Sequence, residues 1–301
     1  MQIIQKELET LNVHIINILS DSKNQISGEV LDYLSAKSKR IRPSMIFLAA
    51  KAMETEVNEE VYNLACAVEL IHNSTLIHDD ILDNADTRRG RVSLNYKLGN
   101  SLSVLAGDLL LSAALQELAK CKKAEVIDIF SKSLYSMCRG EINQNFTIGR
   151  LPDMDEYIKK SEDKTAELFK APLVSLCIVS GIEEKDKICS FAKNFGIAFQ
   201  IKDDLLNILN TDNTKPVFSD VYNGIYTAPV IYMSRDCIDI ENCTKTQIIN
   251  ILMSDKKYIQ QTVDLIKEYA DRAIASLDFI KDNEYKREII KITENLYKAG
   301  M

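Results

Sequence analysis

The segment EEVYNLACAVELIHNSTLIHDDILDNADTRRGR, residues 59–91, decides how the chain folds. Its apolar residues recur every three or four positions over 59–82, which predicts one long helix that ends at the RRGR turn, 88–91. Three carboxylates stand near the end of that helix: Asp79, Asp80 and Asp83. Because like charges on neighbouring turns repel one another, we expect something positive to hold them together.

Helical periodicity extends over most of the 301 residues. Further examples are PSMIFLAAKAM (43–53), VLAGDLLLSAALQELAKC (104–121) and QTVDLIKEYADRAIASL (261–277). Glycine (10) and proline (5) are few for this length, and neither strand-like alternation nor a long flexible linker is evident. The sequence therefore predicts a single all-α domain over residues 1–301, built as a helical bundle.

The charge and cysteine content restrict the classes of function. A net charge of −7, with no broad basic stripe, argues against a general nucleic-acid binder. Seven scattered cysteines without a CxxC pair predict reduced thiols rather than disulfides or a zinc site. The first twenty residues carry Glu7 and Glu9 on a helical period, unlike a signal peptide, and no apolar run reaches the roughly 18 residues of a membrane span. We expect a cytoplasmic protein that is not integral to a membrane.

An internal repeat places the acidic motif twice. IHDDILD (77–83) recurs as IKDDLLN (201–207), an offset of 124 residues. Asp79 and Asp83 are four residues apart and share a helix face, and Asp203 and Asn207 repeat that spacing. Such oxygen ligands suit Mg²⁺ or Mn²⁺, and Mg²⁺ usually completes its shell with substrate phosphates. A single motif is often only a solvated helix end, but the second copy favours a metal site.

Two basic clusters accompany the acidic motifs. Arg88 and Arg89 follow the first motif, and guanidinium groups pair with phosphate oxygens in a bidentate fork. The stretch KRIRP (39–43) brings Lys39, Arg40 and Arg42 to the start of a helix whose first residue we expect to be Pro43. Free backbone N–H groups there would favour an anion. The alternative for this stretch is an ordinary solvated charge run.

Further polar residues extend this pattern. His72 lies two turns before Asp79 and is expected to contact ligand, whereas His78 lies about 100° round the helix and is assigned no role. Lys164 and Thr165 begin another helix, and Lys215 stands in the long polar segment 209–229. Two acidic metal sites and at least two basic clusters together predict two diphosphate substrates.

These motifs resemble the trans-isoprenyl diphosphate synthase (polyprenyl synthetase) family. The resemblance covers about residues 35–235 and runs, in family order, through KRIRP, IHNSTLIHDDILDNADTRRG, GDLLLSAA, GEINQ, KTAELF, FGIAFQIKDDLLN and KPVFSDVYNGIYTAP. It implies an isoprenoid-synthase-type all-α bundle around a deep central cavity, usually a homodimer. It also implies head-to-tail condensation of isopentenyl diphosphate with an allylic diphosphate.

The resemblance also implies a role for each matching residue. Asp79, Asp83 and Asp203 would bind two or three Mg²⁺ ions, with Mn²⁺ as an alternative, and Asp80 and Asp204 would support them. The allylic diphosphate would be held by Arg88, Lys164, Thr165, Gln200 and Lys215. Isopentenyl diphosphate would be held by Lys39, Arg42, His72 and Arg89. The five aspartates, Arg88 and Lys164 would be the catalytic set.

Three positions differ from the family pattern. Lys37-Ser38 replace a glycine pair, Asn207 replaces the last aspartate of the second motif, and Ile225 stands where a lysine follows Gly224. The change at Ile225 removes a cation from the expected allylic site.

Residues before the first motif bear on product length. Ser74 and Thr75 are small where bulky aromatic residues would stop chain growth, so we expect a product of twenty carbons or more, geranylgeranyl diphosphate or longer. The alternative is that a deeper side chain of LLLSAAL (109–115) closes the tunnel.

Two other functions compete with this hypothesis. A non-catalytic or regulatory subunit of a heteromeric prenyl synthase would explain Ile225 and the missing glycines. A class I terpene cyclase would ionise a single diphosphate and would not need the second basic site of Lys39, Arg42 and His72. Its second metal motif also differs from DDLLN.

Overall fold

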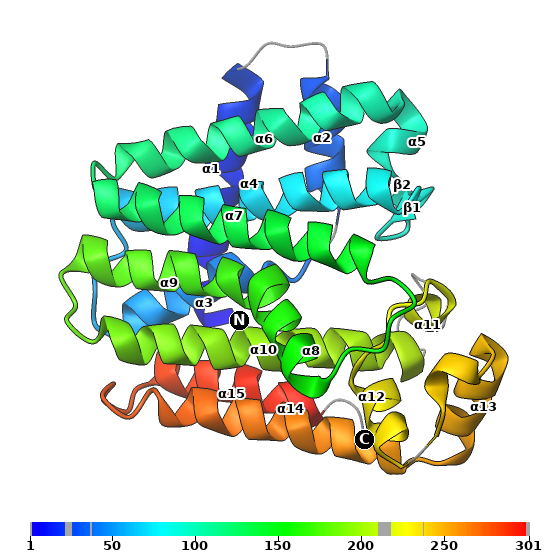
Figure 1. Ribbon diagram of the computed structural model, residues 1–301. Coiled ribbons are helices and arrows are strands. Elements are labelled where there is room, and N and C mark those ends of the chain that lie inside the picture. The colour runs from blue at the N-terminus through cyan, green and yellow to red at the C-terminus, as the bar shows by residue number, and fades with distance from the viewer. Residues whose placement is uncertain (1, 22–25, 37, 210–217, 237, 299–301) are drawn as a thin grey trace. The chain divides into compact units, whose positions relative to one another are not determined.

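The computed structural model describes residues 2–21, 26–36, 38–209, 218–236 and 238–298, and helices account for most of them (Figure 1). The long helices are α1 (Gln5–Asp21), α3 (Ile41–Ala52), α4 (Glu59–Leu82), α6 (Asn100–Lys120), α7 (Ala124–Phe146), α9 (Glu167–Ser180), α10 (Lys185–Leu209), α14 (Lys257–Ala275) and α15 (Glu284–Lys298). The shorter ones are α2 (Ser27–Leu34), α5 (Leu94–Leu98), α8 (Met154–Ser161), α11 (Ser219–Tyr222), α12 (Ala228–Arg235) and α13 (Lys245–Ser254). The predicted all-α class is confirmed.

The chain divides into two compact units, each assembled from separate segments. Unit 1 comprises Met1–Ile129, Pro172–Glu183 and Lys281–Ile289. Unit 2 comprises Phe130–Ala171, Glu184–Ile280 and Ile290–Met301. The first acidic motif therefore belongs to unit 1 and the second to unit 2, and the single domain expected from the sequence stays a prediction.

Helix α4 forms the centre of unit 1, where it packs against α3 and α6 (Figure 1). Its eight residues from 64 to 71 are all buried, as expected of a core helix that is apolar on every side. The helix begins at a cap in which Asn58 Oδ1 accepts a hydrogen bond from the Val61 N–H at 3.2 Å. Packing on several sides fixes the orientation of α4 in unit 1, and with it the place of the acidic motif at the end of the helix.

Helix α6 lies close to α4 because of a glycine. A Cβ added to Gly107 would lie 2.2 Å from His78 Nε2, so the imidazole occupies the space of a missing side chain. Within the described part of the chain, α6 is the one helix that is long and apolar enough to cross a membrane, and 44% of the relevant window is buried. Core helices of soluble proteins share that composition.

In unit 2, α10 packs against α14 and against a π-helical turn, η2 (Glu162–Ala166) (Figure 1). A Cβ added to Gly196 would lie 2.4 Å from Ala166 Cα, so only glycine permits this approach. Phe169 and Phe195 pack edge to face beside it, with ring centroids 5.0 Å apart. This close packing fixes the position of η2 relative to α10, the helix that carries the second acidic motif.

The end of the long acidic helix differs from the prediction. Helix α4 ends at Leu82, before the RRGR stretch, and the chain then forms a two-stranded hairpin of β1 (Thr87–Arg88) and β2 (Arg91–Val92). Its two turn residues, Arg89 and Gly90, have φ of 52° and 74°, the pattern of a type I′ turn. With two residues a strand, the hairpin is too short to produce visible alternation.

The start of α3 also differs from the prediction. The helix begins at Ile41, preceded by Arg40 in the left-handed region, so Pro43 is its third residue and not its first. A proline remains compatible with that place, since the first-turn N–H groups have no partner within the helix.

We expect Gly196→Ala to destabilise the protein by about 1–3 kcal/mol, the usual range for overpacking, because the added methyl group meets backbone atoms of η2. The matched control is Gly28→Ala, since a Cβ there meets nothing within 4 Å in helix α2. That control should be neutral or stabilising by up to about 1 kcal/mol. Urea titrations followed by circular dichroism measure both. Equal stabilities for the two variants would contradict the close packing of α10 on η2.

Candidate active site

The first acidic motif occupies the last turn of α4. Asp79 is half-buried and Asp83, the residue that caps the helix, is exposed. The carbonyl end of a helix carries partial negative charge and disfavours carboxylates. Several acidic groups at this end are therefore arranged against the local field, and a cation would offset both their mutual repulsion and the helix dipole.

Asp80 is the buried member of the motif, with 1% of its surface exposed. Arg88, on the hairpin, donates to Asp80 Oδ1 from Nε at 2.7 Å and approaches it with Nη2 at 2.5 Å. The Tyr33 hydroxyl donates to Oδ2 at 3.4 Å. Burial raises the pKa of Asp80, although the Arg88 guanidinium acts in the opposite direction. Asp80 thus ties the end of α4 to the hairpin, which identifies it as a positioning residue.

The predicted basic cluster also comes together in unit 1. Arg42 Nη1 lies 3.3 Å from His72 Nε2. Burial, followed by nearby arginines, holds the pKa of His72 well below its usual range, so the imidazole is neutral at neutral pH. Those arginines are Arg42, Arg89 and Arg88. The structure therefore brings four of the sequence-predicted anion-binding residues to one place.

Other members of that stretch lie differently. Lys39 is exposed. Arg40 Nη1 lies 3.9 Å from Glu69 Oε1, an ion pair with a buried residue of α4. His78, which was assigned no role, packs over Gly107 and lies 3.5 Å from Asp108 Oδ1.

The second acidic motif repeats the construction of the first. On α10, Asp203 is exposed while Asp204 is buried. The Tyr157 hydroxyl donates to Asp204 Oδ2 at 2.6 Å, and Gln200 Nε2 donates to Oδ1 at 2.7 Å. Burial raises the pKa of Asp204, although its hydrogen bonds favour the charged form. In both motifs, the first aspartate is accessible and the second is anchored by a tyrosine.

Sequence reasoning missed these two tyrosines, although a signal for them exists. Tyr33 precedes Asp80 by 47 residues, and Tyr157 precedes Asp204 by the same number. The offset of 124 residues that relates the acidic motifs therefore relates the tyrosines as well. A search for partners at that offset would have found them.

Lys164 and Thr165 lie on the π-helical turn η2, a form of helix that is frequent at functional sites. Lys164 Nζ lies 2.6 Å from Glu141 Oε2. The Thr165 hydroxyl donates to Gln200 Oε1, so both ends of the Gln200 amide are engaged. Gln200 and Thr165 thus support Asp204, a role that the sequence had not assigned to them.

Asn207 serves the following segment. Its Nδ2 donates to Ser219 Oγ at 2.6 Å, and its Oδ1 accepts from the Asp220 N–H at 3.4 Å. In this structure the Asn207 amide therefore binds a side chain and the backbone of α11, and its role as a third oxygen ligand stays a prediction. Lys215, the remaining predicted residue, lies outside the described residues.

The predicted chain-length residues are bound to backbone. Ser74 is buried, and its hydroxyl donates to the Gly107 carbonyl of α6 at 2.8 Å. The half-buried Thr75 donates to the His72 carbonyl within α4, also at 2.8 Å. Both hydroxyls are thereby satisfied without a polar ligand, so these positions present no free polar group to a hydrocarbon chain.

Among its described residues, unit 1 has one further group with metal-ligand chemistry: His14, Cys66 and Glu117. His14 Nε2 lies 2.7 Å from Glu117 Oε2, and Lys120 pairs with the same carboxylate at 2.5 Å. Burial raises the pKa of the Cys66 thiol, which disfavours the thiolate that a metal needs. The contact of Glu117 with His14 and its ion pair with Lys120 therefore account for this cluster. The six described cysteines are free thiols, as predicted.

We expect Asp80→Ala to cost about 3–5 kcal/mol of folding free energy, because it leaves the Arg88 guanidinium partly buried without its partner. The control is Asp32→Ala, which removes an exposed pair with Arg91 and should cost about 0–1 kcal/mol. Chemical denaturation compares the two variants with the parent protein. A loss of similar size in both would show that the Asp80 contact does not anchor α4.

Comparison with known proteins shows which family the chain belongs to. The polyprenyl synthetase family model matches residues 24–269. A prenyl transferase of Cyanidium caldarium is 31% identical over 312 residues, which cover 98% of this chain and 96% of that protein. The heptaprenyl diphosphate synthase of Staphylococcus aureus superposes with a TM-score of 0.91 at 26% identity, covering 99% of both chains. The polyprenyl synthase of Caulobacter crescentus CB15, solved with calcium and isoprenyl diphosphate, has a TM-score of 0.89 at 25% identity and covers 98% of this chain and 95% of its own. The chain belongs to the polyprenyl synthetase family.

Proposed function

We propose that the chain catalyses head-to-tail condensation of isopentenyl diphosphate with an allylic diphosphate to give a polyprenyl diphosphate. One observation carries this proposal. Two acidic motifs share one construction, in which an accessible aspartate precedes a buried aspartate that a tyrosine anchors. Membership of the polyprenyl synthetase family supports the same reaction class.

The accessible carboxylates fit a hard divalent cation. Asp79, Asp83 and Asp203 would hold two or three Mg²⁺ ions, with Mn²⁺ as an alternative, and substrate phosphates would complete the shells. The neighbouring buried aspartates fix the helix ends from which these ligands project, and hydrogen-bonded groups behind metal ligands commonly orient them in this way. The Caulobacter crescentus structure was solved with both calcium and isoprenyl diphosphate, which supports a divalent ion and a diphosphate as ligands here.

Ionisation of the allylic substrate would depend on positive charge around its leaving group. When bound, the ions would neutralise charge that grows on the departing diphosphate. Lys164 would add an ammonium from η2, since its three donors can serve Glu141 and a phosphate oxygen together. Arg88 would contribute mainly through Asp80, because its guanidinium already pairs with that carboxylate. Positive groups fixed before the reaction need no reorganisation during it.

The second substrate would bind at the basic cluster of unit 1. Arg42 and Arg89 would pair with the isopentenyl diphosphate, and the neutral imidazole of His72 would donate or accept one hydrogen bond there. Lys39 would approach from its exposed place before α3. Holding the homoallylic double bond near the allylic cation lowers the entropic part of the barrier. A terpene cyclase has no use for this second anion site, which disfavours that alternative.

We further propose a product of twenty carbons or more. Ser74 and Thr75 carry no bulk that would stop chain growth, and both are satisfied by backbone carbonyls. The Staphylococcus aureus relative is a heptaprenyl diphosphate synthase, which supports a long product. The same assay that tests the reaction also measures the product length.

A homodimer in the cytoplasm is the proposed working form. The outer face of α6 exposes large apolar residues: Leu102, Val104, Leu105 and Leu115. Contiguous apolar patches on a protein surface commonly mark interaction sites. A second copy of α6 would cover this face, which would explain why a helix with such an apolar composition is only partly buried.

The free thiols of the described cysteines agree with a reducing compartment such as the cytoplasm.

The reaction is tested with radiolabelled isopentenyl diphosphate, Mg²⁺ and allylic primers of increasing length, with products resolved by chromatography. We expect turnover by the parent protein and loss of turnover in Asp79→Ala, with helical content unchanged, because the variant lacks an accessible metal ligand. Asp86→Ala, an exposed carboxylate just past the motif, is the control and should retain activity. Near-normal turnover by Asp79→Ala would contradict the metal role. Turnover only after another chain is added would favour the regulatory-subunit alternative.

The dimer is tested by light scattering on a size-exclusion column. We expect a mass about twice the 34.0 kDa of the chain, and a monomer for Leu105→Glu, because a charge in a buried apolar interface is costly. Tyr96→Glu, which alters an exposed residue of α5, is the control and should leave the dimer intact. A dimeric Leu105→Glu would show that the exposed face of α6 is not the interface.

A further inference from the structure

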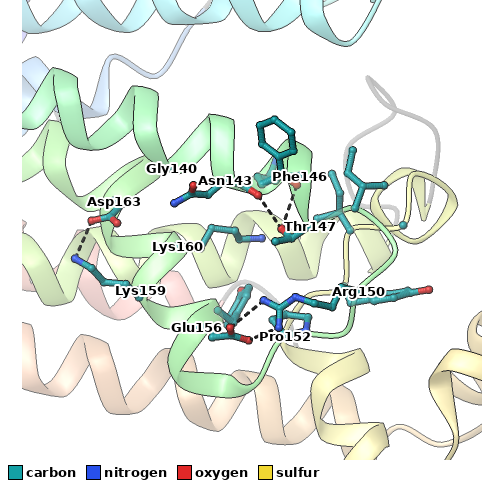
Figure 2. Close-up of a pocket in the computed structure, with 16 residues that line it drawn as sticks. Gly140, Asn143, Phe146, Thr147, Arg150, Pro152, Glu156, Lys159, Lys160 and Asp163 are labelled. Carbon is teal, nitrogen blue, oxygen red and sulfur yellow. Dashed lines mark hydrogen bonds and ion pairs between the residues drawn. The ribbon is translucent and has the colours of Figure 1, made fainter.

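Unit 2 contains a pocket of about 350 Å³ between α7, α8 and the segment around Gly224 (Figure 2). Three cationic side chains line it: Arg150, Lys159 and Lys160. Two of them are neutralised by carboxylates. Arg150 forms a fork with Glu156 at 2.9 and 3.1 Å, and Lys159 lies 2.8 Å from Asp163.

Lys160 differs from the other two cations. Among the described residues, no carboxylate lies within 4.0 Å of its ammonium, which lies over the Tyr157 ring at 5.4 Å from the ring centroid. Figure 2 shows the side chain reaching into the pocket toward Thr147. Burial lowers the pKa of Lys160, as expected for an ammonium that has lost water without gaining an ion pair. An anion entering the pocket would offset that cost.

The position of Lys160 connects it to the second acidic motif. It precedes Lys164 by one helical turn, so both ammonium groups project from neighbouring turns. The charges that act on it most are those of Asp204 and Lys164, followed by Asp220 and Glu141. The tyrosine whose ring lies beneath it is also the one whose hydroxyl holds Asp204. Lys160 therefore lies where a diphosphate bound by this motif would need positive charge.

The same pocket contains one of the residues at which this chain departs from the family pattern. Ile225 lines the pocket next to Gly224, at the position where the family pattern has a lysine. Isoleucine offers neither charge nor a hydrogen-bond donor. The loss of a cation at residue 225 and an unpaired cation at residue 160 thus occur on two walls of one cavity.

We propose that Lys160 binds the allylic diphosphate and replaces the lysine that is absent at position 225. The inference rests on the proposed function, and it explains how a chain with Ile225 binds its allylic substrate without a partner subunit. The pocket would thus keep one positive charge for the diphosphate, supplied by Lys160 of α8 and not by a lysine after Gly224.

Binding of an unreactive allylic analogue, S-geranyl thiodiphosphate with Mg²⁺, measured by calorimetry, tests this inference. Lys160→Met keeps the unbranched apolar part of the side chain and removes its ammonium group. We expect the Kd to rise about ten- to a hundredfold, the range for a hydrogen bond to a charged group. The Kd for isopentenyl diphosphate should not change. Lys159→Met, an adjacent cation already paired with Asp163, is the control and should bind the analogue as the parent does.

A compensating substitution sharpens the test. In the Lys160→Met background, Ile225→Lys should restore binding of the analogue, because it returns the cation to the family position. A merely structural role for Lys160 predicts no such rescue. An unchanged Kd in Lys160→Met, an equal loss for both ligands, or a failure of Ile225→Lys to restore binding would each overturn the inference. If binding depends on Lys160 but the parent protein turns over no primer, the proposed reaction fails and the Lys160 site stands.

Discussion

Each acidic motif depends on the burial of one of its aspartates. Asp80 and Asp204 point inward, where a tyrosine hydroxyl and a second donor satisfy each carboxylate. Successive residues of a helix are rotated by about 100°, so fixing the buried aspartate also fixes which way its neighbours project. The accessible Asp79 and Asp203 are consequently presented by helices that cannot rotate without exposing a charge to an apolar core.

Much of this could be predicted from the sequence because it is periodic or repeated. The apolar spacing identified α4, and the repeated DDxx[DN] motif identified both groups of carboxylates. The spacing of Asn207 gave its position on the helix but not its partners, because equal spacing does not reveal that α11 binds the amide. The hairpin at Arg88 escaped prediction because its strands are too short to show a period. Helical spacing alone did not show which carboxylate of each motif is buried, because the tyrosine partners lie 47 residues away and are related only by the 124-residue offset.

Small residues explain how helices approach closely enough to make these contacts. Gly196 lets α10 meet η2, which places Thr165 within hydrogen-bonding reach of Gln200 and so supports Asp204. Gly107 likewise lets α6 approach α4, and the Ser74 hydroxyl then reaches the Gly107 carbonyl. The π turn shifts Lys164 and Thr165 relative to an ordinary helix, which directs them at α7 and α10 respectively. Gly107 and Gly196 thus set both how closely the helices pack and which side chains can form hydrogen bonds between them.

Each unit contains buried charged groups that have lost water. Asp80 and Asp204 have raised pKa values and Lys160 has a lowered one, and burial is the leading cause in each case. These opposite shifts have one origin, since water has been removed from charged groups whose partners only partly replace it. A metal–diphosphate complex carries both signs of charge, so it can serve carboxylates and ammonium at once. By mass action, any ligand that binds only the folded state also stabilises it. Under the proposed function, part of the energy lost in dehydrating these groups would be recovered on binding, and such recovery would favour a ligand in which cation and phosphate arrive together over either component alone.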